Sequence, residues 1–122
     1  MTRSVEDGYL VLTPKGILED FAPDLPIAER DLLLATQTPT QGAALGAEIT
    51  TAAWRVKPSW FVIASNDRMI APEQERVTAK RMNAKTLTLP TSHVPMLSSP
   101  QEVADFIVLA SSGQSDPIPP QD

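Results

Sequence analysis

The stretch from Trp60 to Leu89 constrains the fold more than any other part of this chain. Trp60 to Ala64 is an aromatic and β-branched run without polar alternation. Such a run is typical of a strand buried on both faces of a parallel sheet, and a buried helix is the competing interpretation. A charged helix over Pro72 to Met82 and a second short strand over Lys85 to Leu89 follow it. Strand, helix and strand in this order predict a right-handed crossover between two parallel strands, and therefore the α/β class.

A closing helix is predicted from Pro100 to Ala110. The residues Ser99-Pro100-Gln101-Glu102 have the pattern of a capping box with proline at the first helical position. The apolar residues that recur at helical spacing behind this box are Val103, Phe106, Ile107 and Ala110. Two parallel strands with their helices still leave sheet edges and faces uncovered, so the sequence predicts an incomplete sheet.

The part of the chain before the first predicted strand has a different pattern. Proline interrupts residues 8–50 at Thr13-Pro14, Asp24-Leu25-Pro26 and Thr38-Pro39, each time beside a side chain suited to capping a helix. This pattern predicts a set of short helices. In the middle one, apolar residues from Ile27 to Ala35 recur at helical spacing, which predicts an amphipathic helix lying on another part of the molecule.

Composition and charge exclude several classes of protein. Ten basic against fifteen acidic residues give a net charge of -5, the wrong sign for neutralising phosphates, so nucleic-acid binding is not expected. The chain has no cysteine and one histidine, and we expect neither a metal nor another cofactor. The start lacks an apolar signal segment, and no apolar run approaches the roughly 20 residues that cross a bilayer. We therefore expect no membrane association and a cytoplasmic location.

The candidate chemistry lies at Asp67 and His93, each a few residues past a predicted strand. In a parallel sheet, functional groups gather beyond the carboxyl ends of the strands, so the topology brings these two residues together. A carboxylate beside an imidazole orients the ring and stabilises the imidazolium, as the acid of a catalytic triad does. Two alternatives remain open at this point. In the first, His93 is a hydrogen-bonded packing residue. In the second, Ser65-Asn66-Asp67 is an ordinary Asx turn with Arg68 as a surface partner.

The attacking group of such a triad is not evident. No Gly-x-Ser-x-Gly occurs in the 122 residues, and the three serines near the candidate pair, Ser65, Ser92 and Ser98, all lack the glycine-flanked turn that exposes a nucleophilic hydroxyl. The charged residues from Glu73 to Arg76 are interpreted as a solvated helix face. Trp54 and Trp60 are interpreted as core or interface anchors.

Two segments resemble a known family. Residues 57–73 are similar to the penultimate core strand and acid turn of the α/β-hydrolases, and residues 92–100 are similar to their histidine turn. Within the α/β-hydrolases, the two segments resemble most the group that includes plant methyl esterases, hydroxynitrile lyases and related bacterial esterases. Hydroxynitrile lyases of this group have lysine after the histidine, whereas this chain has Val94, so the resemblance favours ester hydrolysis. It implies that Asp67 is the triad acid and His93 the triad histidine.

The resemblance covers about residues 8–110 and implies the C-terminal part of an α/β-hydrolase fold, with a helical cap, the last two parallel strands and their helices. The expected organisation is a flexible start over residues 1–7, a cap or lid over 8–56, an α/β core segment over 57–110 and a disordered tail over 111–122. When complete, the enzyme is expected to hydrolyse small carboxylic esters.

Because the nucleophile elbow and oxyanion loop are not found, the chain is expected to be inactive alone, with Asp67 and His93 as a remnant of the catalytic machinery. The expected partners are a complementary N-terminal half or a second copy of the chain. The alternative functions are a non-catalytic binding or assembly module and one half of a split hydrolase.

Overall fold

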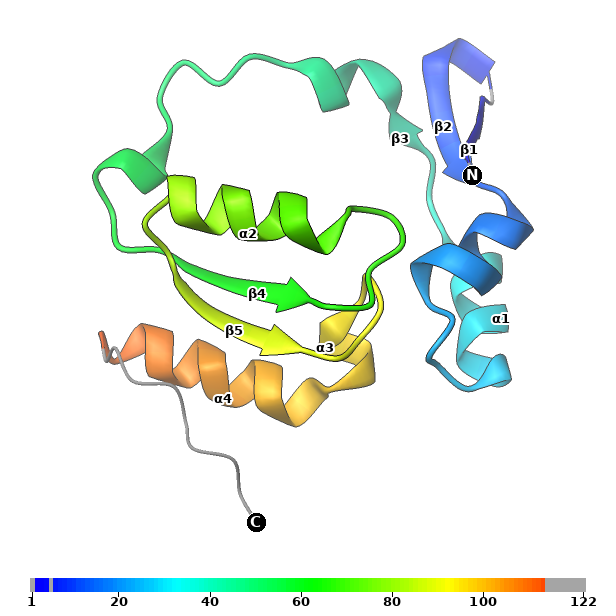
Figure 1. Ribbon diagram of the computed structural model, residues 1–122. Coiled ribbons are helices and arrows are strands. Elements are labelled where there is room, and N and C mark those ends of the chain that lie inside the picture. The colour runs from blue at the N-terminus through cyan, green and yellow to red at the C-terminus, as the bar shows by residue number, and fades with distance from the viewer. Residues whose placement is uncertain (1, 5, 114–122) are drawn as a thin grey trace.

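The computed structural model describes residues 2–4 and 6–113, and a parallel pair of strands lies at its centre (Figure 1). β4 (Trp60–Ala64) pairs with β5 (Lys85–Leu89), in the register Trp60 with Lys85 through Ala64 with Leu89. Helix α2 (Pro72–Arg81) forms the crossover between them. These three elements confirm the predicted strand, helix and strand, and the two strands form a sheet by themselves in the described part of the chain.

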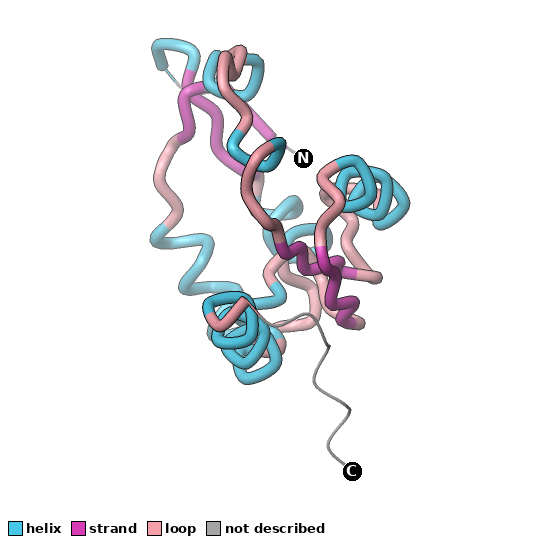
Figure 2. The backbone as a smooth tube through the Cα atoms, turned by 90° about the vertical axis from the view of Figure 1, so that its left-hand side faces the viewer, coloured by secondary structure: helices cyan, strands magenta, loops and turns pink. Residues whose placement is uncertain are grey.

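The parallel pair is covered on both faces by helices. α2 and α4 (Pro100–Ser111) lie on opposite sides of it, as the two views at right angles show (Figures 1 and 2). α2 buries Ala79 and α4 buries Phe106 and Leu109, while Ile63 and Ala64 of β4 are buried between the layers. After α2, Asn83 takes a positive φ of 49°, the left-handed conformation that asparagine tolerates and that ends a helix abruptly.

Two details predicted for α4 are wrong. Ser99 makes no side-chain capping bond. Its backbone N–H, which a capping box would pair with Glu102, donates instead to the Pro95 carbonyl at 2.8 Å, at the end of the short helix α3 (Pro95–Ser98). Ile107 is 62% exposed and does not belong to the buried stripe. The face that packs on the sheet follows Phe106 and Leu109 instead.

The N-terminal part contains a small sheet that the sequence interpretation missed. β1 (Thr2–Ser4), β2 (Tyr9–Leu12) and β3 (Thr40–Gln41) form an antiparallel sheet in that order, with the turn η1 (Glu6–Gly8) between the first two strands. The Gln37 side chain holds β2 in place, because it accepts from the Leu12 N–H and donates to the Leu12 carbonyl, both at 3.0 Å. The helix predicted to begin at Thr38-Pro39 is wrong at its start, because β3 occupies Thr40–Gln41.

The other two helices predicted in this part are present. η2 (Gly16–Phe21), a short π-helical stretch, follows Thr13-Pro14, and the Thr13 hydroxyl accepts from the Gly16 N–H at 3.0 Å. α1 (Ile27–Thr36) follows Asp24-Leu25-Pro26, but no side chain caps it. Asp24 has another partner, described below.

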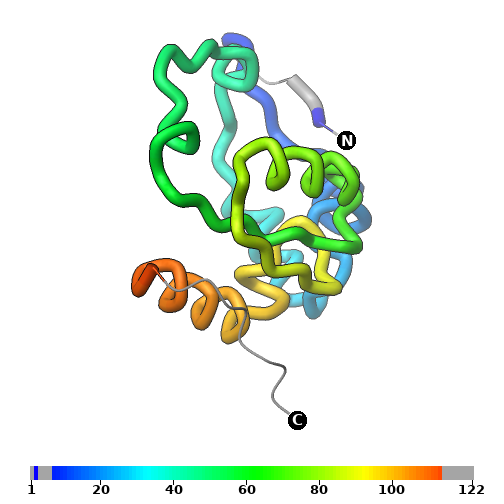
Figure 3. The backbone as a smooth tube through the Cα atoms, turned by 60° about the vertical axis from the view of Figure 1, so that its left-hand side comes forward, coloured from blue at the N-terminus to red at the C-terminus, as the bar shows by residue number. Residues whose placement is uncertain are grey.

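The connection between the two sheets runs as an arch from β3 to β4 (Figure 3). It contains the two short 3-10 helices η3 (Gly42–Gly46) and η4 (Ala53–Arg55). Its apolar side chains are largely exposed, with Leu45 at 76% and Ile49 at 80%. Trp54 anchors the end of the arch on α2, since the Arg81 guanidinium lies over its ring at 5.6 Å.

The expected tail over residues 111–122 begins with Ser111, which is the last residue of α4. The remainder of the tail from residue 114, and residues 1 and 5 of the expected flexible start, lie outside the described residues. Among the residues that are described, no helix combines the length and the apolar character needed to cross a membrane.

Candidate active site

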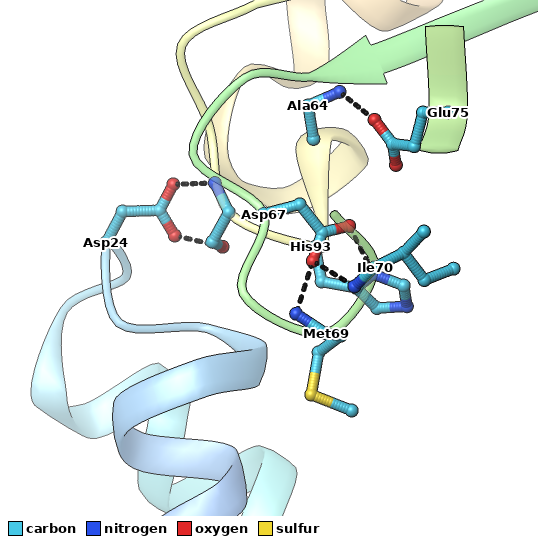
Figure 4. A network of polar contacts seen from close by, with 8 residues as sticks. Asp24, Ala64, Asp67, Met69, Ile70, Glu75 and His93 are labelled. Atoms are coloured by element: carbon cyan, nitrogen blue, oxygen red, sulfur yellow. Dashed lines mark hydrogen bonds and ion pairs between the residues drawn. The ribbon is translucent and has the colours of Figure 1, made fainter. Parts of the chain in front are cut away.

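Asp67 lies in the turn that follows β4, with its side chain fully buried. One carboxylate oxygen, Oδ1, accepts the backbone N–H groups of Met69 at 2.6 Å and Ile70 at 3.0 Å (Figure 4). This is the Asx turn that the sequence left open as an alternative. The turn does not compete with a role in the site, because it occupies Oδ1 and leaves Oδ2 for another partner.

That partner is His93, which follows β5. Its Nδ1 lies 2.7 Å from Asp67 Oδ2, although the two residues are 26 positions apart (Figure 4). The ring of Phe21 packs against the imidazole, with 5.3 Å between ring centroids and 52° between ring planes. The side chain of His93 is 29% exposed. The structure thus joins the two predicted residues at the carboxyl ends of neighbouring parallel strands.

The electrostatics of the pair favour an ionised acid and an oriented ring. Burial by itself raises the pKa of Asp67, but hydrogen bonds from His93, Ile70 and Met69 outweigh burial and hold the pKa below its ordinary value. Because the carboxylate is an acceptor, Nδ1 of His93 carries the proton and Nε2 presents its lone pair. Within the described part of the chain, no group hydrogen-bonds to Nε2. The ring can therefore accept a proton at Nε2.

A second buried carboxyl group, Glu75 of α2, was missed by the sequence interpretation. The charge pattern predicts that it lies on a solvated helix face, yet it is only 9% exposed and its Oε2 accepts the Ala64 N–H at 2.8 Å (Figure 4). Burial raises the pKa of Glu75, and the negative charge of Asp67 raises it further against the opposing effects of the Ala64 N–H and His93. Its position four residues before the apolar Ala79, on the same helix face, is the signal that indicates burial.

The residue before the histidine is also held by a carboxylate. Ser92 is 1% exposed, and its N–H donates to Asp24 Oδ2 at 2.8 Å while its hydroxyl donates to Asp24 Oδ1. Burial raises the pKa of Asp24, but the two bonds from Ser92 hold it below its ordinary value. The sequence predicts Asp24 as a helix cap, because the burial of the Ser92 donors, and their need for a partner, are not evident from the sequence.

None of the three serines near the pair donates to His93. The Ser65 hydroxyl donates to the Leu89 carbonyl at 3.2 Å, that of Ser98 to the Val94 carbonyl at 3.3 Å, and that of Ser92 to Asp24. The described site therefore offers an acid and a base, and its neighbouring hydroxyl groups are engaged elsewhere.

The fold and the site define a class: an α/β chain that presents a carboxylate–imidazole pair beyond the carboxyl ends of its parallel strands. A sequence model of the Alpha/beta hydrolase family matches residues 2–106. The chain belongs to the alpha/beta hydrolase family, and the predicted fold class and resemblance are confirmed. No curated protein matches the chain in sequence.

Solved structures agree on the fold. The crystal structure of polyneuridine aldehyde esterase matches with a TM-score of 0.74 and 14% identity, over 91% of this chain and 47% of that one. A variant of the same esterase, with alanine in place of a histidine, matches with a TM-score of 0.71 and 15% identity over the same shares. The chain thus spans about half the length of these structures, which fits the incomplete sheet.

Proposed function

We propose that this chain supplies the acid and the base of a carboxylic ester hydrolase that works by a serine, histidine and aspartate mechanism. The observation that carries the proposal is the 2.7 Å contact between His93 Nδ1 and Asp67 Oδ2, in a chain of the alpha/beta hydrolase family. In such enzymes the acid holds the ring in the tautomer whose other nitrogen faces the serine.

The proposed roles follow from the geometry. His93 Nε2 takes the proton of an attacking serine hydroxyl as the hydroxyl oxygen bonds to the ester carbonyl carbon. The imidazolium that forms is stabilised by the ionised Asp67. His93 then returns this proton to the departing alkoxide, which leaves as an alcohol, and water completes hydrolysis of the acyl-enzyme by the same steps.

The serine and the oxyanion donors are proposed to come from a polypeptide segment other than the described residues. The hydroxyl groups of Ser65, Ser92 and Ser98 are engaged with other partners, and no Gly-x-Ser-x-Gly is found in the chain. The chain spans 47% of the esterase it matches in fold, and a complementary half of comparable size has room for both features.

Small carboxylic esters are the proposed substrates. The structure that matches in fold is named as an esterase, and Val94 follows the histidine where the resemblance to hydroxynitrile lyases would need lysine. Val94 is buried in an apolar cluster with Ala22 and Leu25, so its side chain serves packing and carries no charge to the substrate. Both points favour ester hydrolysis over cyanohydrin cleavage.

Reconstitution tests the proposal. The chain is mixed with the N-terminal half of a related esterase that carries the missing strands and a Gly-x-Ser-x-Gly elbow, and hydrolysis of a short-chain aryl ester is followed. We expect turnover by the mixture that His93→Ala abolishes, and neither burst nor turnover by the chain alone. Sustained hydrolysis by the chain alone, lost in His93→Ala, would contradict the external nucleophile.

The second candidate is a non-catalytic assembly module, and the observation that favours it is the two-stranded sheet. In the part of the chain that the structure describes, β4 has β5 as its one partner strand. Its outer edge, where Glu75 occupies the Ala64 N–H at the end of the strand, has room for an added strand. The occupant proposed for the β4 edge is the same strand of a second copy of this chain. Size-exclusion chromatography tests this: a compact, protease-resistant monomer contradicts it, and a symmetric dimer assigns the edge to a second copy.

A further inference from the structure

Residues 20–25, which end η2 and lead into α1, contact both turns of the candidate site. We call them the docking segment. Asp20 Oδ1 pairs with Arg68 Nε at 3.2 Å, next in sequence to Asp67. Phe21 packs its ring against His93. The docking segment therefore reaches the acid turn through one residue and the histidine turn through the next.

The same segment also holds both sequence neighbours of His93. Ala22 and Leu25 form a buried cluster with Val94, which follows the histidine. Asp24 accepts the N–H and the hydroxyl of Ser92, which precedes it. Phe21 thus holds the ring of His93. The backbone of His93 is held on both sides, through an apolar contact at Val94 and a polar contact at Ser92.

The polar contact is the one with directional character. Two donors of one residue meet the two oxygens of one carboxylate, so the pair fixes both the position and the orientation of the Ser92 backbone. Ser92 is 1% exposed, so water cannot readily replace Asp24 as the partner of these donors. Asp24 itself is exposed. Loss of the pair would therefore leave the donors of Ser92 without a partner and release the backbone of the histidine turn.

We propose that Asp24 is a positioning residue that, through Ser92, holds the histidine turn so that His93 Nδ1 meets Asp67. This proposal deepens the proposed function and rests on it, because it assigns the support of the same acid–base pair. The docking segment belongs to the part that precedes the arch, whereas Asp67 and His93 follow β4 and β5, so Asp24 connects the two parts of the chain at the site (Figures 1 and 4). The ion pair of Asp20 with Arg68 supports the acid turn from the same segment.

The single histidine makes the proposal testable on the chain as it exists. In nitrogen-15-labelled protein, the ring signals of His93 need no assignment, since there is one histidine. The proton on Nδ1 is expected as a low-field signal that exchanges slowly with water, because it is shared with a buried carboxylate. In Asp24→Ala we expect this proton to exchange about tenfold to a hundredfold faster, the factor that corresponds to the loss of a hydrogen bond to a charged group.

Matched variants separate positioning from general destabilisation. Asp31→Ala removes the same charge from an exposed position of α1 and is expected to leave the exchange rate unchanged. Asp24→Asn keeps an oxygen for the Ser92 N–H and an amide that can donate to the Ser92 hydroxyl, and is expected to restore part of the protection. Ser92→Ala removes the hydroxyl bond alone and is expected to give an intermediate rate, which provides the test if Asp24→Ala does not fold.

The outcomes distinguish this proposal from the proposed function. If Asp24→Ala shifts the Ser92 amide signal and Ser92→Ala shifts the amide signals of the neighbouring residues, but both leave the His93 ring signals and exchange rate unchanged, Asp24 has no positioning role. If the unsubstituted chain shows no protected Nδ1 proton, the Asp67–His93 bond itself, and with it the proposed function, is contradicted. If the exchange rates change as expected but reconstitution yields no esterase activity, the proposed function is contradicted and the positioning role of Asp24 is not.

Discussion

The carboxylate of Glu75, on the buried face of α2, accepts the N–H of Ala64, the last residue of β4, at 2.8 Å. In a parallel pair, alternate residues of a strand direct their backbone groups to the partner strand. The Ser65 N–H donates to the Leu89 carbonyl, and the Lys85 N–H donates to the Ser59 carbonyl. Since these serines direct their backbone groups to β5, the N–H of Ala64 points to the other edge of β4. Glu75 satisfies this donor three residues before Asp67, and thereby supports the start of the acid turn.

Glu75→Gln is expected to stabilise the chain near neutral pH. Because burial raises the pKa of Glu75, its contribution to stability is fully present below the ordinary carboxyl pKa and is lost as the pH rises through the raised value. Glutamine keeps an acceptor for the Ala64 N–H without the charge. We expect the free energy of unfolding to rise by about 0.5 to 2 kcal/mol at about pH 7 and to be unchanged at about pH 3, as measured in urea.

The control for this substitution is Glu73→Gln. Glu73 lies on the exposed face of α2, where it pairs with Arg76 at 3.5 Å, so its replacement is expected to change stability by less than about 0.5 kcal/mol. Equal stabilisation by both substitutions would indicate an effect of net charge and contradict the burial argument.

Asp67→Asn is expected to have the opposite pH dependence. Hydrogen bonds hold the pKa of Asp67 below its ordinary value despite burial, so its contribution is present above that value and is lost as the pH falls through the lowered one. We expect a loss of about 1 to 3 kcal/mol at neutral pH that shrinks in acid, measured by urea unfolding across the range. A loss independent of pH would show that the charge of Asp67 is not what stabilises the turn.

The same substitution is expected to change the tautomer of His93. The asparagine amide donates to Nδ1, so the ring proton moves to Nε2, and nitrogen-15 shifts of the ring report the change. In the reconstituted enzyme this leaves no lone pair at Nε2, and kcat is expected to fall by roughly 10³ to 10⁴ with little change in KM. An unaltered tautomer together with a normal kcat would remove Asp67 from the mechanism.

Phe106→Ala and Ile107→Ala form a matched pair on α4. Phe106 is 6% exposed and Ile107 is 62% exposed. We expect the first to lower the free energy of unfolding by about 3 to 5 kcal/mol, because it leaves a cavity under the helix, and the second by less than about 0.5 kcal/mol. Thermal or chemical unfolding followed by circular dichroism measures both, and similar losses would mean that α4 packs with a different face.

The parts of the fold that the sequence predicts are those with local signals. Trp60 to Ala64 is apolar throughout, Pro72 and Pro100 stand where helices begin, and these features need no knowledge of distant residues. The strand β2 has no such signal, because Tyr9–Leu12 becomes a strand only by pairing with segments on both sides, one of them near Thr40. Its pairing is decided by contacts that a local pattern does not contain.

The site divides in the same way. Asp67 and His93 are predictable because strand topology alone brings the carboxyl ends of β4 and β5 together. Asp24 is not, because its partner Ser92 is 68 positions away and the need for a partner arises only when Ser92 is buried. Glu75 lies between these cases, since its spacing from Ala79 indicates the buried face but its charge suggests exposure.

The composition of β4 has a consequence for handling the isolated chain. Its five residues, Trp60–Ala64, include neither a charged residue nor a proline. Natural proteins place such residues on edge strands to prevent one chain from pairing with another. A short segment of this kind with free main-chain groups is suited to seeding cross-β fibrils. We therefore expect the chain to form fibrils at high concentration and on long storage, which thioflavin fluorescence of a concentrated sample would report.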